Sequence, residues 1–510
     1  MANPLYDALF GKHADQSTPF LHLAGGAVLS HAAFLEMAAR FAHTLSDAGL
    51  KAGDRLAAQV QKSPDALALY AACVQTGVVF LPLNTAYTGD ELRYFIEDSG
   101  AKLVVCDDQD IAALSDITGP LAAQIFSLNG DGTGSFSQAA QTKPNTFATV
   151  DRSRDDLAAF LYTSGTTGRS KGAMLTQGNL LSNAEMLADY WQFGPSDVLL
   201  HALPIFHTHG LFVASNVVLA SGGSMIFLPG FDQDQIIDLL PQATVMMGVP
   251  TFYTRLLGDA RFAKELVGHM RLFISGSAPL LAETHLQFEA RTGHRILERY
   301  GMTETNMSTS NPYEGERRAG TVGFPLPGVE VKITDPKTGA EREPGAIGHI
   351  EVRGPNVFKG YWQMPDKTAA ELREDGFFIT GDLGKMDEDG YVHIVGRDKD
   401  LIISGGYNIY PKEVELVLDA QPGVLESAVI GVPHPDFGET VLGLIVPRAG
   451  EALDLEQVKT AASASLARFK HPRELVTVPE LPRNTMGKVQ KNLLREKYKD
   501  RFTAPPPSEG

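Results

Sequence analysis

Residues 157–172 of this 510-residue chain have the sequence LAAFLYTSGTTGRSKG. The apolar run that ends at Tyr162 predicts a buried strand, and the residues after it combine Thr and Ser hydroxyl groups, three glycines and Lys171. Glycine lets backbone N–H groups approach an anion closely, hydroxyl groups add hydrogen-bond donors, and lysine adds a full positive charge. The stretch therefore predicts a strand that leads into a loop built to hold a polyphosphate.

The spacing of this loop excludes one common phosphate-binding motif. A Walker A loop has a glycine, four further residues and then Gly-Lys-Ser/Thr. Here Ser170 stands where the second glycine is required, and Lys171 is followed by Gly172. The other interpretation is a flexible linker, which the preceding strand and the apolar segment after the loop disfavour.

The sequence around this loop alternates between strand and helix patterns. Residues 56–60 predict a strand, Ser63 caps a helix that ends near Gly77, and residues 78–81 predict the next strand. The same alternation recurs between residues 222 and 258. It predicts an α/β protein whose parallel-rich sheets are covered by helices.

The pattern changes toward the end of the chain, which sets the predicted domains. Short alternating strands begin at about residue 320, and mixed helices and strands follow residue 400. We therefore expect a large domain over residues 1–396, with a β-rich subdomain from about 320 to 396. A small α+β domain follows over residues 400–502, and a Pro- and Ser-rich tail over residues 503–510 is expected to be disordered.

Composition limits the partners and the compartment. The formal net charge is −17, which disfavours nucleic acid and anionic membranes as partners. No apolar run reaches the roughly 18 residues of a membrane-spanning helix, and residues 1–20 do not have the pattern of a signal peptide. Cys73 and Cys106 lie in apolar runs and are expected to be reduced and buried. A cytoplasmic location is expected.

The phosphate loop resembles the signature loop of the adenylate-forming superfamily, which comprises acyl- and aryl-CoA synthetases, luciferases and nonribosomal adenylation domains. Further motifs of that superfamily follow in its order between about residues 160 and 490. The resemblance implies that ATP and Mg²⁺ are used, with coenzyme A as co-substrate. It assigns nucleotide contacts to Thr163, Ser164, Gly165, Thr166, Thr167, Gly168, Lys171, Gly276, Ser277, Ala278, Glu298, Arg299, Tyr300, Gly301, Met302 and Thr303.

The resemblance also implies a metal site and a mobile small domain. Glu304, with Thr163, would hold Mg²⁺, a hard cation that prefers oxygen ligands. Residues 397–399 would form the hinge about which the small domain rotates between the two half-reactions. The remaining nucleotide and pantetheine contacts would come from Asp382, Arg397, Lys399, Gly405, Gly406 and Tyr407.

Lys488 matches the lysine that carries adenylation in this superfamily. With Glu304 and Thr163 it forms the predicted catalytic set, in which positioning and charge stabilisation replace a protein nucleophile. The carboxylate would attack the α-phosphorus of ATP, and a thiol would then attack the acyl-adenylate. Lys488 is also a candidate target of a lysine acetyltransferase and deacetylase, because acetylation would neutralise its charge.

The acid is the least constrained part of this interpretation. The superfamily's acid pocket maps onto His207, Thr208, His209, Ser277 and Met302, together with the helix after Pro250. Arg255 on that helix could pair with a second carboxylate, although it could equally be a surface arginine. The arrangement is most similar to ligases that activate malonate and, in some cases, methylmalonate.

Three alternatives stay open at this stage. One is a ligase for another small or medium acid, and the second is an adenylation enzyme that loads a carrier protein. The third is a catalytically silent sensor, although such a protein should have lost Lys488, Glu304 or the loop glycines, and all are present.

Overall fold

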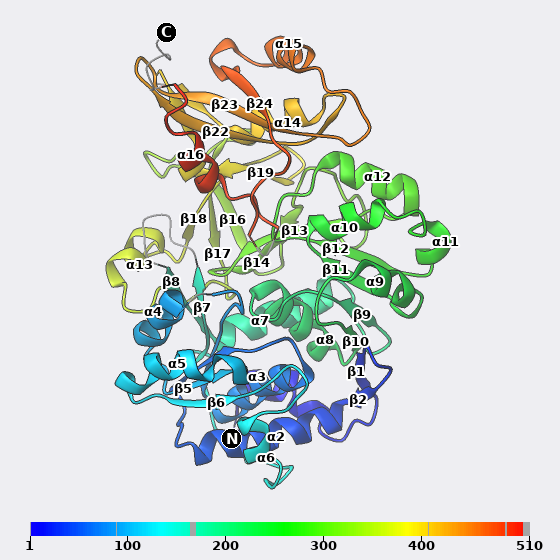
Figure 1. Cartoon of the computed structure of the whole chain (residues 1–510), viewed down its shortest axis with the longest axis vertical. Helices are drawn as coiled ribbons and strands as arrows, with labels where there is room; N and C mark the ends of the chain where they lie inside the picture. Colours follow the sequence, from blue (N-terminus) through cyan, green and yellow to red (C-terminus); the bar gives the residue numbers. More distant parts are fainter. Residues whose placement is uncertain (1, 88, 164–169, 406, 485–486, 503–510) are drawn as a thin grey trace. The chain divides into compact units, whose positions relative to one another are not determined.

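A computed structural model of the chain describes residues 2–87, 89–163, 170–405, 407–484 and 487–502 (Figure 1). The chain divides into two compact units. The larger holds residues 1–331 and 352–378, and the smaller holds residues 332–351 and 379–510. The predicted hinge at residues 397–399 stays a prediction.

One sheet of the larger unit has six strands in the order β6–β5–β3–β4–β7–β8. All neighbouring strands are parallel except β7 and β8, which form an antiparallel hairpin. The strands are β3 (Arg55–Gln59), β4 (Val79–Pro82), β5 (Leu103–Cys106), β6 (Gln124–Ser127), β7 (Leu157–Thr163) and β8 (Lys171–Thr176).

The predicted strand–helix–strand unit is present in this sheet. Strand β3 leads through helix α3 (Pro64–Thr76) to the parallel strand β4. The Ser63 side chain accepts a hydrogen bond from the Ala66 N–H group, and Gly77 ends the helix in the left-handed conformation. These local signals fix both ends of the helix, as the sequence predicts.

The second sheet of the larger unit has nine strands in the order β15–β14–β13–β12–β11–β9–β10–β1–β2. Its centre is parallel, and β2, β14 and β15 are antiparallel additions at the edges. The strands are β1 (Pro19–Leu23), β2 (Val28–Ser30), β9 (Val198–His201), β10 (Ser224–Phe227), β11 (Val245–Gly248), β12 (Leu272–Ser275), β13 (Leu297–Met302), β14 (Asn306–Ser310) and β15 (Phe324–Pro325).

Helices cover these sheets and bury apolar side chains. Among them are α2 (His31–Asp47), α7 (Gln177–Tyr190), α8 (Asn216–Ser221), α9 (Gln233–Leu239), α10 (Pro250–Leu257) and α12 (Ala282–Thr292). Helix α13 (Pro365–Glu371) has no buried residue. Cys73 and Cys106 are buried and unpaired, as expected. In the part of the chain that the structure describes, no helix combines the length and apolarity that crossing a bilayer requires.

Two further sheets follow, of which the five-stranded one is mostly antiparallel. The four-stranded sheet has the order β16–β17–β18–β19, and the five-stranded sheet of the smaller unit has the order β21–β20–β23–β22 with β24 beside β23. The strands are β16 (Glu330–Thr334), β17 (Gly348–Arg353), β18 (Phe378–Met386), β19 (Val392–Arg397), β20 (Ile402–Ser404), β21 (Tyr407–Ile409), β22 (Val424–His434), β23 (Gly438–Pro447) and β24 (Glu474–Thr477). Helices α14 (Pro411–Asp419) and α15 (Leu455–Ser465) pack together in this unit.

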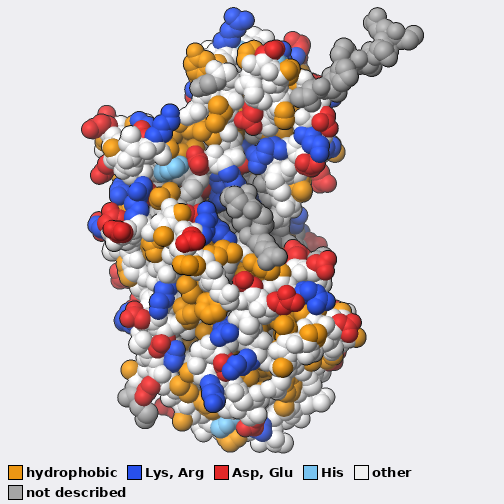
Figure 2. Space-filling model, turned by 90° about the vertical axis from the view of Figure 1, so that its left-hand side faces the viewer, with side chains coloured by type: hydrophobic (Ala, Val, Ile, Leu, Met, Phe, Trp, Pro, Cys, Tyr) orange, Lys and Arg blue, Asp and Glu red, His pale blue; other side chains and the backbone are white. Residues whose placement is uncertain are grey.

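The surface carries both signs of charge. Figure 2 shows acidic and basic side chains interspersed over the face in view. Charges of opposite sign that lie side by side largely cancel at a distance beyond the Debye length.

Candidate functional site

The hairpin of β7 and β8 brings the two ends of the phosphate loop together. Thr163, the last residue of β7, lies opposite Lys171, the first residue of β8. The strand predicted before the loop and the apolar segment predicted after it are therefore both present. The loop residues Ser164, Gly165, Thr166, Thr167 and Gly168 lie outside the described residues.

A network of hydrogen bonds connects the two residues that flank this loop, Thr163 and Lys171. The Tyr361 hydroxyl group lies 3.0 Å from Oε1 of Glu304 and 2.7 Å from Oε2 of Glu371. Lys171 Nζ donates to the Tyr361 hydroxyl at 3.0 Å and pairs with Glu371 at 3.3 Å. The Thr163 hydroxyl lies 3.4 Å from Oε1 of Glu304. Tyr361 thus connects the loop lysine to the predicted metal ligand.

Tyr361 and Glu371 were not predicted as site residues. Tyr361 lies 190 residues from Lys171 in the chain, and no local pattern marks either residue. Burial and the nearby Glu304 carboxylate raise the pKa of Tyr361, so that the phenol is neutral and keeps its hydrogen. A phenol has one hydrogen to donate, so it can bond to only one of the two carboxylates at a time.

The donor set at Glu304 fits Mg²⁺. Glu304 is only 4% exposed and offers a carboxylate, and Thr163 adds a hydroxyl oxygen. No group of three or more His, Cys, Asp or Glu side chains that could hold a metal occurs among the described residues. Mg²⁺ is often held by one or two carboxylates together with substrate phosphates, so a sparse protein site is what that ion requires.

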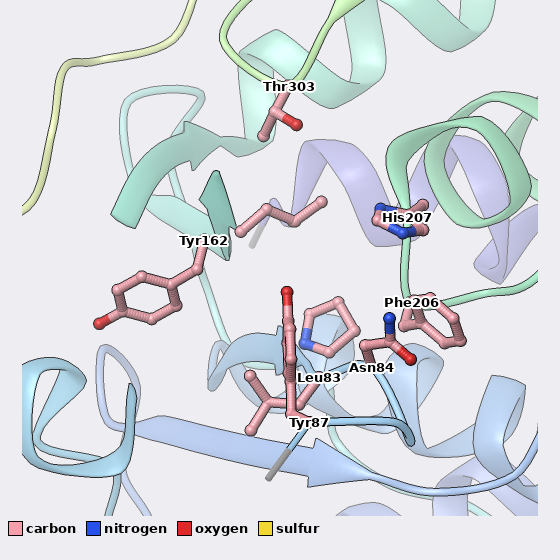
Figure 3. Close-up of a pocket in the computed structure, with 9 residues that line it drawn as sticks. Leu83, Asn84, Tyr87, Tyr162, Phe206, His207 and Thr303 are labelled. Carbon is pink, nitrogen blue, oxygen red and sulfur yellow. The ribbon is translucent and has the colours of Figure 1, made fainter. Parts of the chain in front are cut away.

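The predicted acid loop follows strand β9. Thr208 and His209 are buried, and His209 begins a π-helix over residues 209–215. Single π-helical turns occur often at functional sites. His207 and Thr303 line one pocket together with Tyr87, Asn84 and others, and Figure 3 shows Thr303 on the opposite side of that pocket from Tyr87. A predicted acid residue and a predicted nucleotide residue therefore share a cavity.

The two loop histidines are neutral. Burial lowers the pKa of His207 to about 4. Burial, aided by the nearby Arg299 cation, lowers the pKa of His209 well below 6.5. Neither imidazole can supply a positive charge to a substrate near neutral pH.

The turn after strand β12 carries backbone strain beside the acid loop. Ser277 has φ of 71°, a left-handed conformation that is costly for a residue with a side chain. Its hydroxyl oxygen lies 3.0 Å from Nδ1 of His209. Gly276 packs so closely on the Arg299 guanidinium that a β-carbon at position 276 would lie 2.4 Å from Arg299 Cζ. The absence of a side chain at Gly276 leaves room for that guanidinium.

Arg299 is a buried cation with two unsatisfied hydrogen-bond donors. It is 3% exposed, and its Nε and Nη2 atoms have no hydrogen-bond partner among the described residues. Burial lowers its pKa to about 9, which still leaves it charged near neutral pH. The nearby Glu298 carboxylate partly opposes the effect of burial on this pKa, but two buried donors without hydrogen bonds are still costly and call for an explanation.

Other arginines of the chain show what this edge binds. Arg271 uses Nε and Nη2 to grip both oxygens of Asp197 at 2.7 and 2.8 Å. Arg353 grips Glu330 through the same two atoms at 2.9 and 2.6 Å. A carboxylate placed at the Nε–Nη2 edge of Arg299 would make the same two hydrogen bonds.

Arg255 lies elsewhere. It is exposed on helix α10, with its guanidinium 5.4 Å from the centre of the Phe231 ring. Phe252, Tyr253 and Leu256 form the buried face of the same helix. Arg255 is therefore not part of the buried face of α10, and its predicted contact with a second carboxylate stays a prediction.

The segment from Glu298 to Thr303 runs along strand β13 into the turn before β14. Oε1 of Glu298 accepts a hydrogen bond from the Leu280 N–H group at 3.1 Å, which ties the strand to the turn at 276–278. Tyr300, Gly301 and Met302 are half-buried. A β-carbon at position 301 would lie 1.8 Å from the Asn306 carbonyl oxygen, so the β13–β14 hairpin itself requires glycine there.

In the smaller unit, Asp382 on strand β18 is buried and paired with Arg397 on β19, with Nε and Oδ1 2.8 Å apart. The Thr380 hydroxyl accepts from the Asp382 N–H group at 3.0 Å and fixes the turn. Lys399, Gly405 and Tyr407 are exposed, and Gly406 lies outside the described residues.

The backbone of Lys488 makes two hydrogen bonds with Asn484. Its N–H group donates to Oδ1 of Asn484 at 2.9 Å, and its carbonyl accepts from the Asn484 N–H group at 2.9 Å. Burial, and then the Arg397 cation, lower the pKa of Lys488 to about 8. Its ammonium group is therefore easier to deprotonate than that of a surface lysine.

Comparison with known proteins gives matches over both units. Residues 11–362 match the family described as AMP-binding enzyme, and residues 413–488 match its C-terminal domain. The chain is 38% identical to a mitochondrial malonate–CoA ligase of Mus musculus, across 83% of this chain and 78% of that protein. It is 34% identical to a feruloyl-CoA synthase of an Amycolatopsis species, across 93% and 95% of the two chains.

A solved structure is similar over almost the whole length. It is the crystal structure of ATP-bound MatB from Rhodopseudomonas palustris, which is 59% identical and has a TM-score of 0.96. The match covers 98% of this chain and 100% of that one. It confirms the predicted α/β fold class.

Proposed function

The chain belongs to the AMP-binding enzyme family and is an AMP-forming acid–CoA ligase, and we propose that the acid it activates is malonate. Malonate would attack the α-phosphorus of ATP through one carboxylate, giving malonyl-adenylate and pyrophosphate. The coenzyme A thiol would then attack the acyl carbon, giving malonyl-CoA and AMP. Methylmalonate, which keeps both carboxylates, is the second substrate that we propose.

The observation that carries this proposal is the pair of buried, unsatisfied donors Nε and Nη2 of Arg299. A diacid leaves one carboxylate unreacted, and that group needs a partner in a dry pocket. His207 and His209 are neutral, so they can accept or donate hydrogen bonds but cannot balance the charge. Arg299 would do so through two parallel hydrogen bonds. A monocarboxylic acid would leave this cation unpaired.

The nucleotide end of the proposal uses the groups around the phosphate loop. Lys171 and the loop N–H groups would hold the β- and γ-phosphates, and Tyr300 would stack on adenine. Glu304 and Thr163 would hold Mg²⁺, which would supply charge neutralisation at the phosphates when bound. Tyr361 would keep the Glu304 carboxylate oriented, because its hydroxyl group lies within hydrogen-bond distance of it.

Groups of the smaller unit complete the proposed reaction. Asp382 would accept the ribose hydroxyl groups, and Lys399 would be the hinge position. Lys488 would stabilise charge in the adenylation step, and its acetylation by a lysine acetyltransferase would stop that step. The glycines at 405 and 406, with Tyr407, would line the path of pantetheine in the thioester step.

The test is ATP–pyrophosphate exchange with malonate, methylmalonate, succinate, acetate, propionate, ferulate and a medium-chain fatty acid. We expect malonate to give the highest kcat/KM. Arg299→Lys keeps the charge but cannot form two parallel hydrogen bonds to one carboxylate, and Arg299→Met loses both the charge and the hydrogen bonds. We expect kcat/KM for malonate to fall about ten-fold in the first and about a hundred-fold or more in the second, with the KM for ATP unchanged.

Arg255→Met is the matched control, because it removes an exposed arginine from the neighbouring helix. It should leave the malonate parameters as they are. A preference for ferulate or a fatty acid would contradict the malonate assignment. An equal loss for all acids in the Arg299 variants would contradict the assignment of Arg299.

Thioester formation with free coenzyme A separates this proposal from an enzyme that loads a carrier protein. We expect malonyl-CoA to form at a rate comparable to that of exchange. Exchange without any thioester product would favour the carrier-loading alternative.

A further inference from the structure

Two side chains from different sheets meet behind the acid loop. Lys62 follows the end of strand β3 in the six-stranded sheet, and His201 is the last residue of strand β9 in the nine-stranded sheet. Lys62 Nζ lies 2.8 Å from Nδ1 of His201 and 2.8 Å from its carbonyl oxygen. The same amine sits 4.4 Å from the centre of the Phe227 ring. Lys62 therefore links the two sheets through one histidine.

The hydrogen bonds of His201 fix its tautomer. Nε2 of His201 lies 2.9 Å from the carbonyl oxygen of Gly210, and a carbonyl can only accept. Nε2 must therefore carry the hydrogen. Burial, and then the nearby Lys62 amine, lower the pKa of His201 well below 6.5, so the ring is neutral and Nδ1 has no hydrogen. Lys62 must then donate to Nδ1, which gives the direction Lys62 to His201 to Gly210.

Gly210 is the point at which this chain of hydrogen bonds reaches the acid loop. It follows His209 in the π-helix, and its carbonyl also accepts from the Ser215 hydroxyl at 2.9 Å. A β-carbon at position 210 would lie 2.0 Å from the Pro204 carbonyl oxygen. The start of the π-helix is thus packed against residue 204 on one side and anchored to His201 on the other.

The position of Gly210 determines where its neighbour His209 meets Ser277. His209 bonds through Nδ1 to the hydroxyl of Ser277, whose strained backbone needs support from its surroundings. Gly276, one residue earlier, packs on the Arg299 guanidinium. A displacement of Gly210 would therefore move His209 and loosen the turn that faces Arg299.

We propose that Lys62 and His201 are positioning residues for the acid substrate, which hold the π-helix at Gly210 and so set the geometry of His209, Ser277 and Arg299. Neither residue needs to touch the acid. The inference rests on the proposed function in one respect, namely that the acid binds at this loop. It does not depend on the acid being malonate.

The test is Lys62→Met, which removes the donor but keeps the length of the aliphatic stem. Kinetics are measured with whichever acid of the panel has the highest kcat/KM. We expect the KM for that acid to rise at least about ten-fold and the KM for ATP to stay within about two-fold, because a small misplacement of binding groups is costly. Lys62→Arg, which can still donate, should recover most of the loss.

His201→Gln provides a second, independent variant, and its combination with Lys62→Met tests whether the two residues act together. We expect the double variant to have the same acid KM as the more affected single variant, since both break one chain of contacts. Lys12→Met is the matched control, because Lys12 also donates to a backbone carbonyl, that of Ala220 at 2.6 Å. It should leave both KM values unchanged.

Several results would overturn the inference. Unchanged acid KM in both single variants would do so, as would a lower kcat with both KM values unchanged, which indicates loss of folded enzyme only. Equal increases for acid and ATP would also contradict it. If Arg299 variants alter malonate use but Lys62→Met does not alter the acid KM, the proposed function stands and this inference fails.

Discussion

The hydroxyl group of Tyr361 lies 3.0 Å from the Glu304 carboxylate and 3.0 Å from the ammonium group of Lys171. The same hydroxyl group lies 2.7 Å from Oε2 of Glu371, and Lys367 forms an ion pair with Glu371 at 2.7 Å. The phenol therefore lies between a glutamate of helix α13 and two groups that the sequence assigns to phosphate and metal binding.

Tyr361→Phe tests this arrangement. The change removes only the oxygen that bridges Lys171 and Glu304, so the ring and its packing are kept. We expect ATP–pyrophosphate exchange to fall about ten-fold, because a hydrogen bond to a charged group is worth roughly 1.5 kcal/mol or more. The Mg²⁺ concentration for half-maximal exchange should rise, since Glu304 would be less well oriented. Exchange measured across a Mg²⁺ titration gives both quantities.

The matched control is Tyr70→Phe. Tyr70 is also buried in the larger unit, and its hydroxyl accepts from Asn216 at 3.3 Å. Exchange in this variant should stay close to that of the unaltered enzyme. If the two variants have the same Mg²⁺ dependence, Tyr361 has no special role.

Asp197 and Arg271 form a pair that stabilises the larger unit. The side chain of Asp197 is 7% exposed, and Arg271 grips it through two nitrogen atoms. Asp197→Asn should lower the free energy of unfolding by about 3 kcal/mol, because it leaves a partly buried guanidinium without its counter-charge. Urea unfolding followed by tryptophan fluorescence is a suitable measurement, since Arg271 also donates to the Trp191 carbonyl.

The pH dependence of that pair has a definite sign. Burial alone would raise the pKa of Asp197, but the hydrogen bonds from Arg271 outweigh it and lower the pKa below 3.8. The stabilisation is therefore fully present above about pH 4 and is lost as the pH falls through the lowered value. Asp234→Asn, at an exposed acid paired with Arg261, is the control and should change little. The prediction would be contradicted if Asp197→Asn and Asp234→Asn lowered the free energy of unfolding by the same amount.

Local sequence signals predicted the helices and strands well. Ser63 and Gly77 mark the ends of α3 because a cap and a left-handed stop depend on neighbouring residues alone. The alternation of strand and helix then predicts the parallel sheets. The contact between Lys171 and Tyr361 could not be predicted in this way, because it depends on how segments 190 residues apart pack together.

The sequence of helix α10 carries a signal about where Arg255 points. Phe252, Tyr253 and Leu256 have the spacing of one buried helix face, and Arg255 falls outside it. That periodicity predicts an exposed position for Arg255, as the structure shows. The two unsatisfied donors of Arg299 could not be predicted from the sequence, because they depend on which side chains the fold places around them. The same holds for Lys62 and His201, which are 139 residues apart.

Gly210→Ala should affect both stability and acid binding. The added β-carbon would lie 2.0 Å from the Pro204 carbonyl oxygen, so the π-helix or the turn at 204 must move. Overpacking of this kind costs roughly 1–3 kcal/mol, and we expect thermal unfolding to shift downward accordingly. The KM for the acid should rise about ten-fold, with the KM for ATP unchanged. Gly230→Ala, at a position with open space, is the control and should alter neither quantity.

The lowered pKa of Lys488 predicts that the rate of the adenylation step falls at alkaline pH. Its pKa is lowered to about 8 by burial and by Arg397, so the ammonium form is present below pH 8 and is lost as the pH rises through that value. If the positive charge stabilises the adenylation transition state, ATP–pyrophosphate exchange should fall above about pH 8. Lys488→Arg keeps the charge at all these pH values and should lose the alkaline fall, even if its rate is lower. Lys488→Gln, which resembles acetyl-lysine, should reduce exchange at least about a hundred-fold at every pH. An alkaline fall that persists unchanged in Lys488→Arg would assign the titration to another group.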